Sequence, residues 1–186
     1  MKSIALLAAC LAASASYADE VNRNSHYFSI FLGDSAQIIG SEDVRYGGGV
    51  SYGFGRPEPR FDFGSFRSQL VYEGYADVTR SLQNSGASPD SLAVGVLALG
   101  RWFEKLPGGR SSFYFDIGWG LQVADTRTYD LPSETNSTPV IGIGFDFSGS
   151  KFDTLVGIRF LHISNANLVY KNRGQDEFFL TIGARF

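Results

Sequence analysis

Residues 113–122 read Phe-Tyr-Phe-Asp-Ile-Gly-Trp-Gly-Leu-Gln, and this alternation indicates the fold. Large apolar side chains fall at every odd position, whereas the even positions from 116 onward carry only aspartate, glycine and glutamine. Successive residues of a β-strand point to opposite faces of a sheet, so the segment predicts a strand with one apolar and one polar face. Helical periodicity is absent along the chain.

The same two-residue period recurs in other segments and predicts a single all-β domain. Its 22 glycines, nine tyrosines and 16 phenylalanines suit a tightly curved sheet with aromatic girdles. Beyond the N-terminus, no apolar run approaches the roughly 20 residues that a transmembrane helix needs. The predicted strands are residues 25–33, 44–55, 66–78, 91–104, 112–123, 139–148, 152–165 and 175–186.

Alternation alone also fits a soluble barrel of the lipocalin kind, whose apolar face points inward. Three features favour a membrane barrel with its apolar face towards lipid. The polar face carries Asp116, Asp146, Arg159 and Arg185 among glycines, which suits a narrow polar lumen. The chain ends on an aromatic residue, Phe186, and long connections alternate with mostly shorter ones. We therefore predict an eight-stranded antiparallel transmembrane β-barrel of the outer-membrane type.

The first 18 residues have the pattern of a secretory signal peptide. Lys2 supplies the positive end, residues 4–13 form the apolar run, and residues 16–18 (Ser-Tyr-Ala) form a small-x-small cleavage site. We expect a mature barrel domain of residues 19–186, exported to the bacterial outer membrane. Cleavage removes the only cysteine and changes the net charge from −3 to −4 by removing Lys2. A disulfide scaffold is therefore excluded.

Residues 162–166 read His-Ile-Ser-Asn-Ala, and Asp176 follows on the next predicted strand. His162 and Ser164 share a face because they are two positions apart, and Asp176 has the parity of lipid-facing Phe178. A serine oxygen, a base that takes its proton and an acid that orients the base are the parts of a hydrolytic triad. With the N-terminus in the periplasm, all three side chains would lie at the outer rim, on the lipid-facing wall.

This segment resembles the PagL family of outer-membrane lipid A 3-O-deacylases. The family motif is His-x-Ser-Asn-Ala, followed by Asn-x-Gly and an acidic residue, and residues 172–176 here read Asn-Arg-Gly-Gln-Asp. Upstream of this region the resemblance rests on length and strand pattern. It implies an eight-stranded barrel whose exterior triad removes the 3-linked acyl chain of lipid A, with Ser164 as nucleophile and His162 as general base.

The resemblance also implies which residues stabilise the oxyanion and which residue is the acid. Asn165 would stabilise the oxyanion through its side chain, and Asn167 stands where the family tends to have a glycine whose backbone N–H completes the oxyanion hole. The family's acid is usually glutamate, and Asp176 occupies that position with a side chain one methylene shorter. Glu177 is the alternative acid, although its parity points it into the lumen.

The expected partner is lipid A, or lipopolysaccharide, in the membrane. No metal and no cofactor are expected, because one histidine beside one carboxylate is a poor cation site. The acidic balance and the lack of basic clusters argue against nucleic acid. The sequence does not exclude a homodimer. The main alternative is a non-catalytic outer-membrane barrel with an adhesive or structural role, and a second is a soluble ligand-binding barrel.

Overall fold

The computed structural model describes residues 23–82, 88–149, 151–170 and 172–186. The predicted signal peptide and the boundary after residue 18 lie outside the described residues. Within the described ranges, no helix has both the length and the apolar character needed to span a bilayer.

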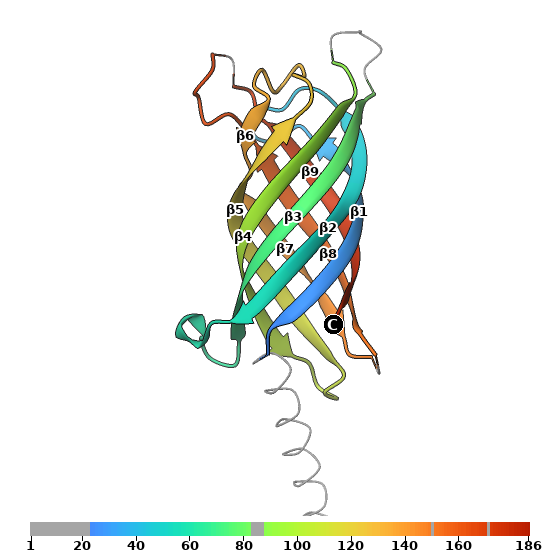
Figure 1. The fold of residues 1–186 in the computed structure, drawn as a ribbon, viewed down its shortest axis with the longest axis vertical. Helices are drawn as coiled ribbons and strands as arrows, with labels where there is room; N and C mark the ends of the chain where they lie inside the picture. The colour runs from blue at the N-terminus through green and yellow to red at the C-terminus, as the bar shows by residue number, and fades with distance from the viewer. Residues whose placement is uncertain (1–22, 83–87, 150, 171) are drawn as a thin grey trace, which may run out of the picture.

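One antiparallel sheet closes into a barrel, which confirms the predicted fold (Figure 1). Each long strand pairs with its neighbours in the sequence, and the first strand pairs with the last to close the cylinder. The long strands are β1 (Ser25–Ala36), β2 (Arg45–Pro57), β3 (Arg67–Ser81), β4 (Ser91–Lys105), β5 (Ser111–Ala124), β7 (Val140–Phe147), β8 (Asp153–Ile163) and β9 (Gln175–Arg185).

A short additional strand, β6 (Thr135–Ser137), was not predicted from the sequence. Three polar residues in a row carry no alternation of hydrophobicity, so the pattern that identifies the other strands is missing there. β6 pairs with β5, and Ser137 also forms an isolated bridge with Ser164 just beyond β8. This bridge brings the connection between β5 and β7 against the segment that carries the His-x-Ser motif.

The two faces of the sheet are oriented as predicted. On β5, Ile117, Trp119 and Leu121 are 45–53% exposed, whereas Asp116 and Gln122 are almost completely buried in the lumen. Large apolar side chains are likewise exposed on the other strands. An apolar wall of this extent is favourable in hydrocarbon and unfavourable in water.

Ion pairs fill the middle of the lumen. Arg101 donates two hydrogen bonds to Asp116, at 2.7 and 2.9 Å, in a fork geometry. Arg159 donates to Glu73 at 2.6 Å and to Asp116 at 3.1 Å. Buried charges are tolerated only when they are paired and hydrogen-bonded, so each of these groups requires its partner.

The lumen is also lined by charges at its two ends. Arg185 lies 2.6 Å from both Asp146 and Asp153. These residues lie at the end of the barrel where β1 begins and β9 ends. At the opposite end, Arg45 pairs with Asp43 at 2.9 Å. The four lumenal guanidiniums named here therefore all have carboxylate partners.

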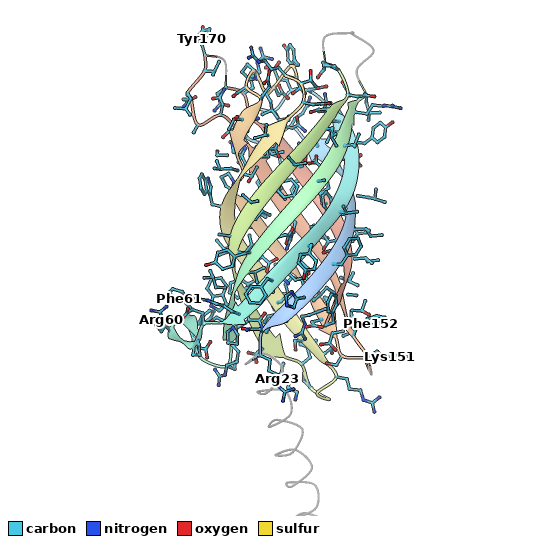
Figure 2. All side chains as sticks on the ribbon, in the orientation of Figure 1. Arg23, Arg60, Phe61, Lys151, Phe152 and Tyr170 are labelled. Carbon is cyan, nitrogen blue, oxygen red and sulfur yellow. The ribbon has the colours of Figure 1, made fainter. Side chains whose placement is uncertain are left out.

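Connections of different length gather at the two ends of the barrel (Figure 1). The end drawn at the bottom carries residues 58–66, with the 3-10 helix η1 (Pro59–Phe61). It also carries the two shorter connections, which follow β4 and β7. The end drawn at the top, named the upper end, carries residues 37–44, 88–90, 125–139, 164–170 and 172–174. Tyr170 lies at the tip of an upper loop, and Arg60 and Lys151 lie at the lower end (Figure 2). The predicted site residues are at the upper end.

Candidate active site

His162 and Asp176 face each other across the β8–β9 pair. They are direct partners in the register, and the Nδ1 atom of His162 lies 2.6 Å from Oδ1 of Asp176. Asp176 is fully buried, whereas the His162 side chain is 21% exposed. Because the carboxylate engages Nδ1, Nε2 is the imidazole nitrogen that remains for a second partner.

The second carboxylate oxygen of Asp176 is held from the other side. The backbone N–H of Ile39, in the loop between β1 and β2, donates to Oδ2 of Asp176 at 2.5 Å. Asp176 is also the register partner of Ala36 at the end of β1. Two separate donors therefore fix the plane of the carboxylate relative to the imidazole.

The loop that carries Ile39 is itself fixed by Asp130, from the connection between β5 and β6. Oδ2 of Asp130 accepts hydrogen bonds from the hydroxyl of Ser41 at 3.2 Å and from the backbone N–H groups of Glu42 and Asp43 at 2.8 and 2.7 Å. Asp130 is fully buried. Its carboxylate satisfies donors that the turn would otherwise leave unpaired.

Arg173 ties the same loops together at the surface. Its guanidinium forms an ion pair with Glu42 and lies 4.4 Å from the centre of the Tyr129 ring. The interaction with the Tyr129 hydroxyl, followed by the charge of Glu42, raises the pKa of Arg173. The loops after β1, β5 and β8 therefore meet around the Asp176 carboxylate.

Two glycines allow the close packing at this point. Gly174 has a φ of +75°, and a Cβ added there would lie 2.6 Å from Cε1 and 3.2 Å from Nε2 of His162. Gly40 has a φ of +90°, and its Cβ would lie 2.7 Å from the carbonyl oxygen of Arg173. Both the backbone conformation and the available space therefore require glycine.

Ser164 follows the last residue of β8 and has the same outward parity as Phe160 and His162. It is 7% exposed, and its backbone is hydrogen-bonded in both directions to Ser137. Its Oγ lies 3.5 Å from Oγ of Ser137. In the part of the chain that the structure describes, no hydrogen bond joins Ser164 to His162. The structure thus pairs His162 with Asp176, and Ser164 follows two residues after His162.

The predicted oxyanion residues lie in the tight turn after β8. Asn165 is 2% exposed; its Nδ2 donates to the carbonyl of Val169 at 3.3 Å, and its backbone N–H donates to Oδ1 of Asn172 at 3.0 Å. Ala166 and Asn167 have φ values of 52° and 63°, in a region that few non-glycine residues adopt. The N–H of Asn167 has no hydrogen-bond acceptor among the residues that the structure describes.

Glu177 points away from this cluster. It is 3% exposed, lines the lumen, and accepts a hydrogen bond from the side-chain amide of Gln175. The carboxylate that contacts the His162 imidazole is therefore that of Asp176. Elsewhere in the described ranges, no group of three or more His, Cys, Asp and Glu side chains is arranged to hold a metal ion.

An apolar groove runs along the outer wall beside the pair. The rings of Phe160 and Phe178, whose centres are 5.0 Å apart, line its end nearest His162. Gly142 contributes backbone to the groove floor, and a Cβ added there would point into the lumen, 2.9 Å from Cγ of Arg159. The remaining lining includes Ile117, Ile141, Ile143 and Ile158.

Sequence reasoning missed three groups around the site: the Ser137 hydroxyl, the Ile39 N–H and the Asp130 carboxylate. The first lies on the strand without alternation. The second is a backbone group, for which side-chain identity gives no signal. Asp130 lies among other polar residues in a long connection, so nothing in the sequence distinguishes it.

The family model described as lipid A 3-O-deacylase (PagL) matches residues 46–185, which include the β8–β9 hairpin and the whole His-x-Ser segment. The chain belongs to the PagL family. A comparison with curated protein sequences finds no match.

Solved structures agree with this membership at the level of the fold. The crystal structure of the outer membrane enzyme PagL has a TM-score of 0.62 and 18% identity, over 84% of this chain and 97% of that chain. The structure of Neisserial surface protein A (NspA) has a TM-score of 0.54 and 15% identity, over 87% and 95% of the two chains. At these identities the similarity shows a shared outer-membrane barrel fold. At the level of the PagL family, the chain is a lipid A deacylase of the bacterial outer membrane.

Proposed function

We propose that the chain is a serine esterase that hydrolyses the ester-linked 3-acyl chain of lipid A in the outer leaflet of the outer membrane. The observation that carries the proposal is the 2.6 Å contact between His162 and Asp176 on the lipid-facing wall. Ser164 follows His162 by two residues and therefore has the same parity. A bilayer-embedded ester can approach groups on this wall, whereas it cannot reach groups inside the narrow lumen.

In the first half of the reaction, Oγ of Ser164 attacks the ester carbonyl carbon as its proton moves to Nε2 of His162. Asp176 keeps the imidazole in the tautomer with a proton on Nδ1 and stabilises the imidazolium that forms. Catalytic hydrogen bonds are often absent or long without substrate and form in the complex, so the bound ester completes the contact between base and serine.

The developing oxyanion needs donors that are already in position. The N–H of Asn167 and the second proton of the Asn165 side-chain amide are the donors proposed here. When the tetrahedral intermediate collapses, the bond to the 3-oxygen of glucosamine breaks and that oxygen takes the proton from His162. Water then attacks the acyl-serine, His162 removes its proton, and the fatty acid leaves with Ser164 restored.

The groove beside Phe160 and Phe178 is the proposed binding surface for the acyl chain. Burying apolar surface contributes about 25 cal/mol per Å² removed from a polar environment. An acyl chain that moves from the bilayer into the groove gains less free energy than this, because the lipid around it is already apolar. The groove therefore orients the chain so that its ester reaches Ser164.

A mass spectrum of lipid A tests the proposal against the alternative of a non-catalytic barrel. Lipid A is compared between bacteria without the chain, with the wild-type chain and with Ser164→Ala, and in isolated outer membranes treated with purified protein. We expect the wild type alone to remove one hydroxyacyl group. An unchanged spectrum with folded wild-type protein in both settings would mean that the barrel is not a deacylase.

Replacement of Gly174 by alanine tests the packing behind the imidazole. The added Cβ would overlap Cε1 of His162, so we expect deacylation to fall at least about tenfold, together with a stability cost of about 1–2 kcal/mol from the left-handed backbone. Gly108→Ala is the matched control, because Gly108 has a φ of +96° and nothing within 4 Å of its Cβ position. We expect the control to carry the stability cost and keep its rate. Equal rates for the two variants would contradict the role given to His162.

A further inference from the structure

Two lumenal carboxylates are left over when the charges in the barrel are paired. Asp77, on β3, and Glu177, on β9, are 6% and 3% exposed. Among the described residues, neither forms an ion pair with a guanidinium or an ammonium group. Arg45, a cation at the same end of the lumen, pairs with Asp43 and donates to the Thr79 side chain. Arg159, which lines the adjoining cavity with the two carboxylates, pairs with Glu73 and Asp116.

Asp77 and Glu177 line the same small cavity at the upper end of the lumen. Buried carboxylates without a cationic partner carry a large desolvation penalty, so the negative charge of this pair must be compensated. A proton or a bound cation could supply that compensation.

A separate observation favours a cation. The amide nitrogen of Gln175 donates to Glu177, which leaves the amide oxygen of Gln175 as the free atom. This oxygen is buried and has no hydrogen-bond partner in the described structure. Gln175 is 2% exposed and lines the cavity with the two carboxylates. With the Gln175 amide oriented as in the structure, a proton shared by the carboxylates would leave this acceptor unsatisfied, whereas a cation would satisfy all three groups.

We propose that the upper lumen binds a hard divalent cation, Ca²⁺ by preference, between the carboxylates of Asp77 and Glu177 and the amide oxygen of Gln175. Ca²⁺ takes six to eight oxygen ligands in flexible geometry, whereas Mg²⁺ requires a near-ideal octahedron and keeps much of its water. Ser91 lines the same cavity, and its hydroxyl is a further candidate ligand.

The proposed cation lies on the inner side of the hairpin that carries the candidate active site on its outer side. In the register, the pair Ile163–Gln175 and the pair Leu161–Glu177 flank the pair His162–Asp176. A cation held by Gln175, Glu177 and Asp77 would therefore link the start of β9 to β3 across the lumen. The proposal goes beyond the esterase function and does not depend on it.

Binding is measured on the full-length chain folded in detergent, without substrate. Tb³⁺ serves as a luminescent probe that tyrosines such as Tyr75, in the adjoining cavity, can sensitise, and Ca²⁺ is titrated as the competitor. The second readout is the midpoint of thermal unfolding, followed by heat-modifiable migration. We expect a dissociation constant for Ca²⁺ in the millimolar range or tighter. At a Ca²⁺ concentration of about a hundred times this constant, we expect the midpoint of thermal unfolding to rise by about 5 °C.

Two variants remove ligands in different ways. Asp77→Asn removes a charge, and Gln175→Leu removes the neutral oxygen at unchanged charge, so each should weaken binding at least about tenfold. Asp34→Asn, an exposed carboxylate on the outer wall, is the control for adventitious surface binding and should bind like the wild type. If Asp77→Asn does not fold, Gln175→Leu still tests the site.

Some results would overturn the proposal. One is a midpoint insensitive to Ca²⁺ in the wild type. Another is equal Tb³⁺ binding by the wild type and Gln175→Leu. Stabilisation by Asp77→Asn without any Ca²⁺ effect would assign the charge compensation to a proton.

Discussion

Ser164→Ala is expected to lower the rate of lipid A deacylation by about a thousandfold or more, while the barrel still folds. The substitution removes only a hydroxyl, and the backbone hydrogen bonds between residues 164 and 137 remain. Without Oγ no acyl-serine can form, and the remaining groups can only orient water. The measurement is the release of fatty acid from purified lipopolysaccharide in detergent micelles, with heat-modifiable migration as the test of folding.

Ser137 provides the matched comparison, because its hydroxyl lies 3.5 Å from that of Ser164. If Ser164→Ala kept its rate and Ser137→Ala lost it, the nucleophile would be the residue on β6. Retention of activity by both variants would exclude a serine mechanism at this site.

Asp176→Asn is expected to lower the rate about a hundredfold to ten-thousandfold. The asparagine cannot accept hydrogen bonds from both the imidazole and the Ile39 N–H through two oxygens, as the carboxylate does. Its amide group would instead favour the imidazole tautomer in which Nε2 carries the proton, and that tautomer cannot act as the base. Steady-state deacylation rates measure the loss. We expect Asp176→Glu, the residue usual in the family, to keep more activity than the asparagine variant.

Asp34→Asn is the control for the loss of one negative charge on the outer wall. Asp34 is exposed at the upper end of β1 and pairs with Phe178 in the register, away from the imidazole. Its substitution should leave the rate unchanged. If Asp176→Asn were fully active and Glu177→Gln inactive, the acid would have to reach the base from the lumen, and the proposed geometry would fail.

The barrel was predictable because one physical rule governs nearly every strand. Lipid on one side and a polar lumen on the other impose a two-residue period, which is visible in Ile117, Trp119 and Leu121 against Asp116 and Gln122. The ends of β1 and β3 extend beyond their predicted limits because they carry polar residues at the rim. β6 was missed because it also lies at the rim, where neither lipid nor the polar lumen imposes a two-residue period on its sequence.

Part of the candidate site was predictable from parity alone. His162 and Asp176 lie on adjacent strands with outward parity, and a hairpin register brings such residues opposite each other. The surroundings could not be predicted in this way. The Ile39 N–H and the Asp130 carboxylate come from loops far away in sequence, and their position depends on how three connections pack over the rim.

The contact between Ile39 and Asp176 links the chemistry to the seam between the first and last strands. One side of the carboxylate is supported by β8, and the other side receives its donor only when β1 has docked against β9. An assembly intermediate with an open seam would lack that second support. The proposed esterase would therefore reach its full rate only after β1 has paired with β9 and the barrel has closed.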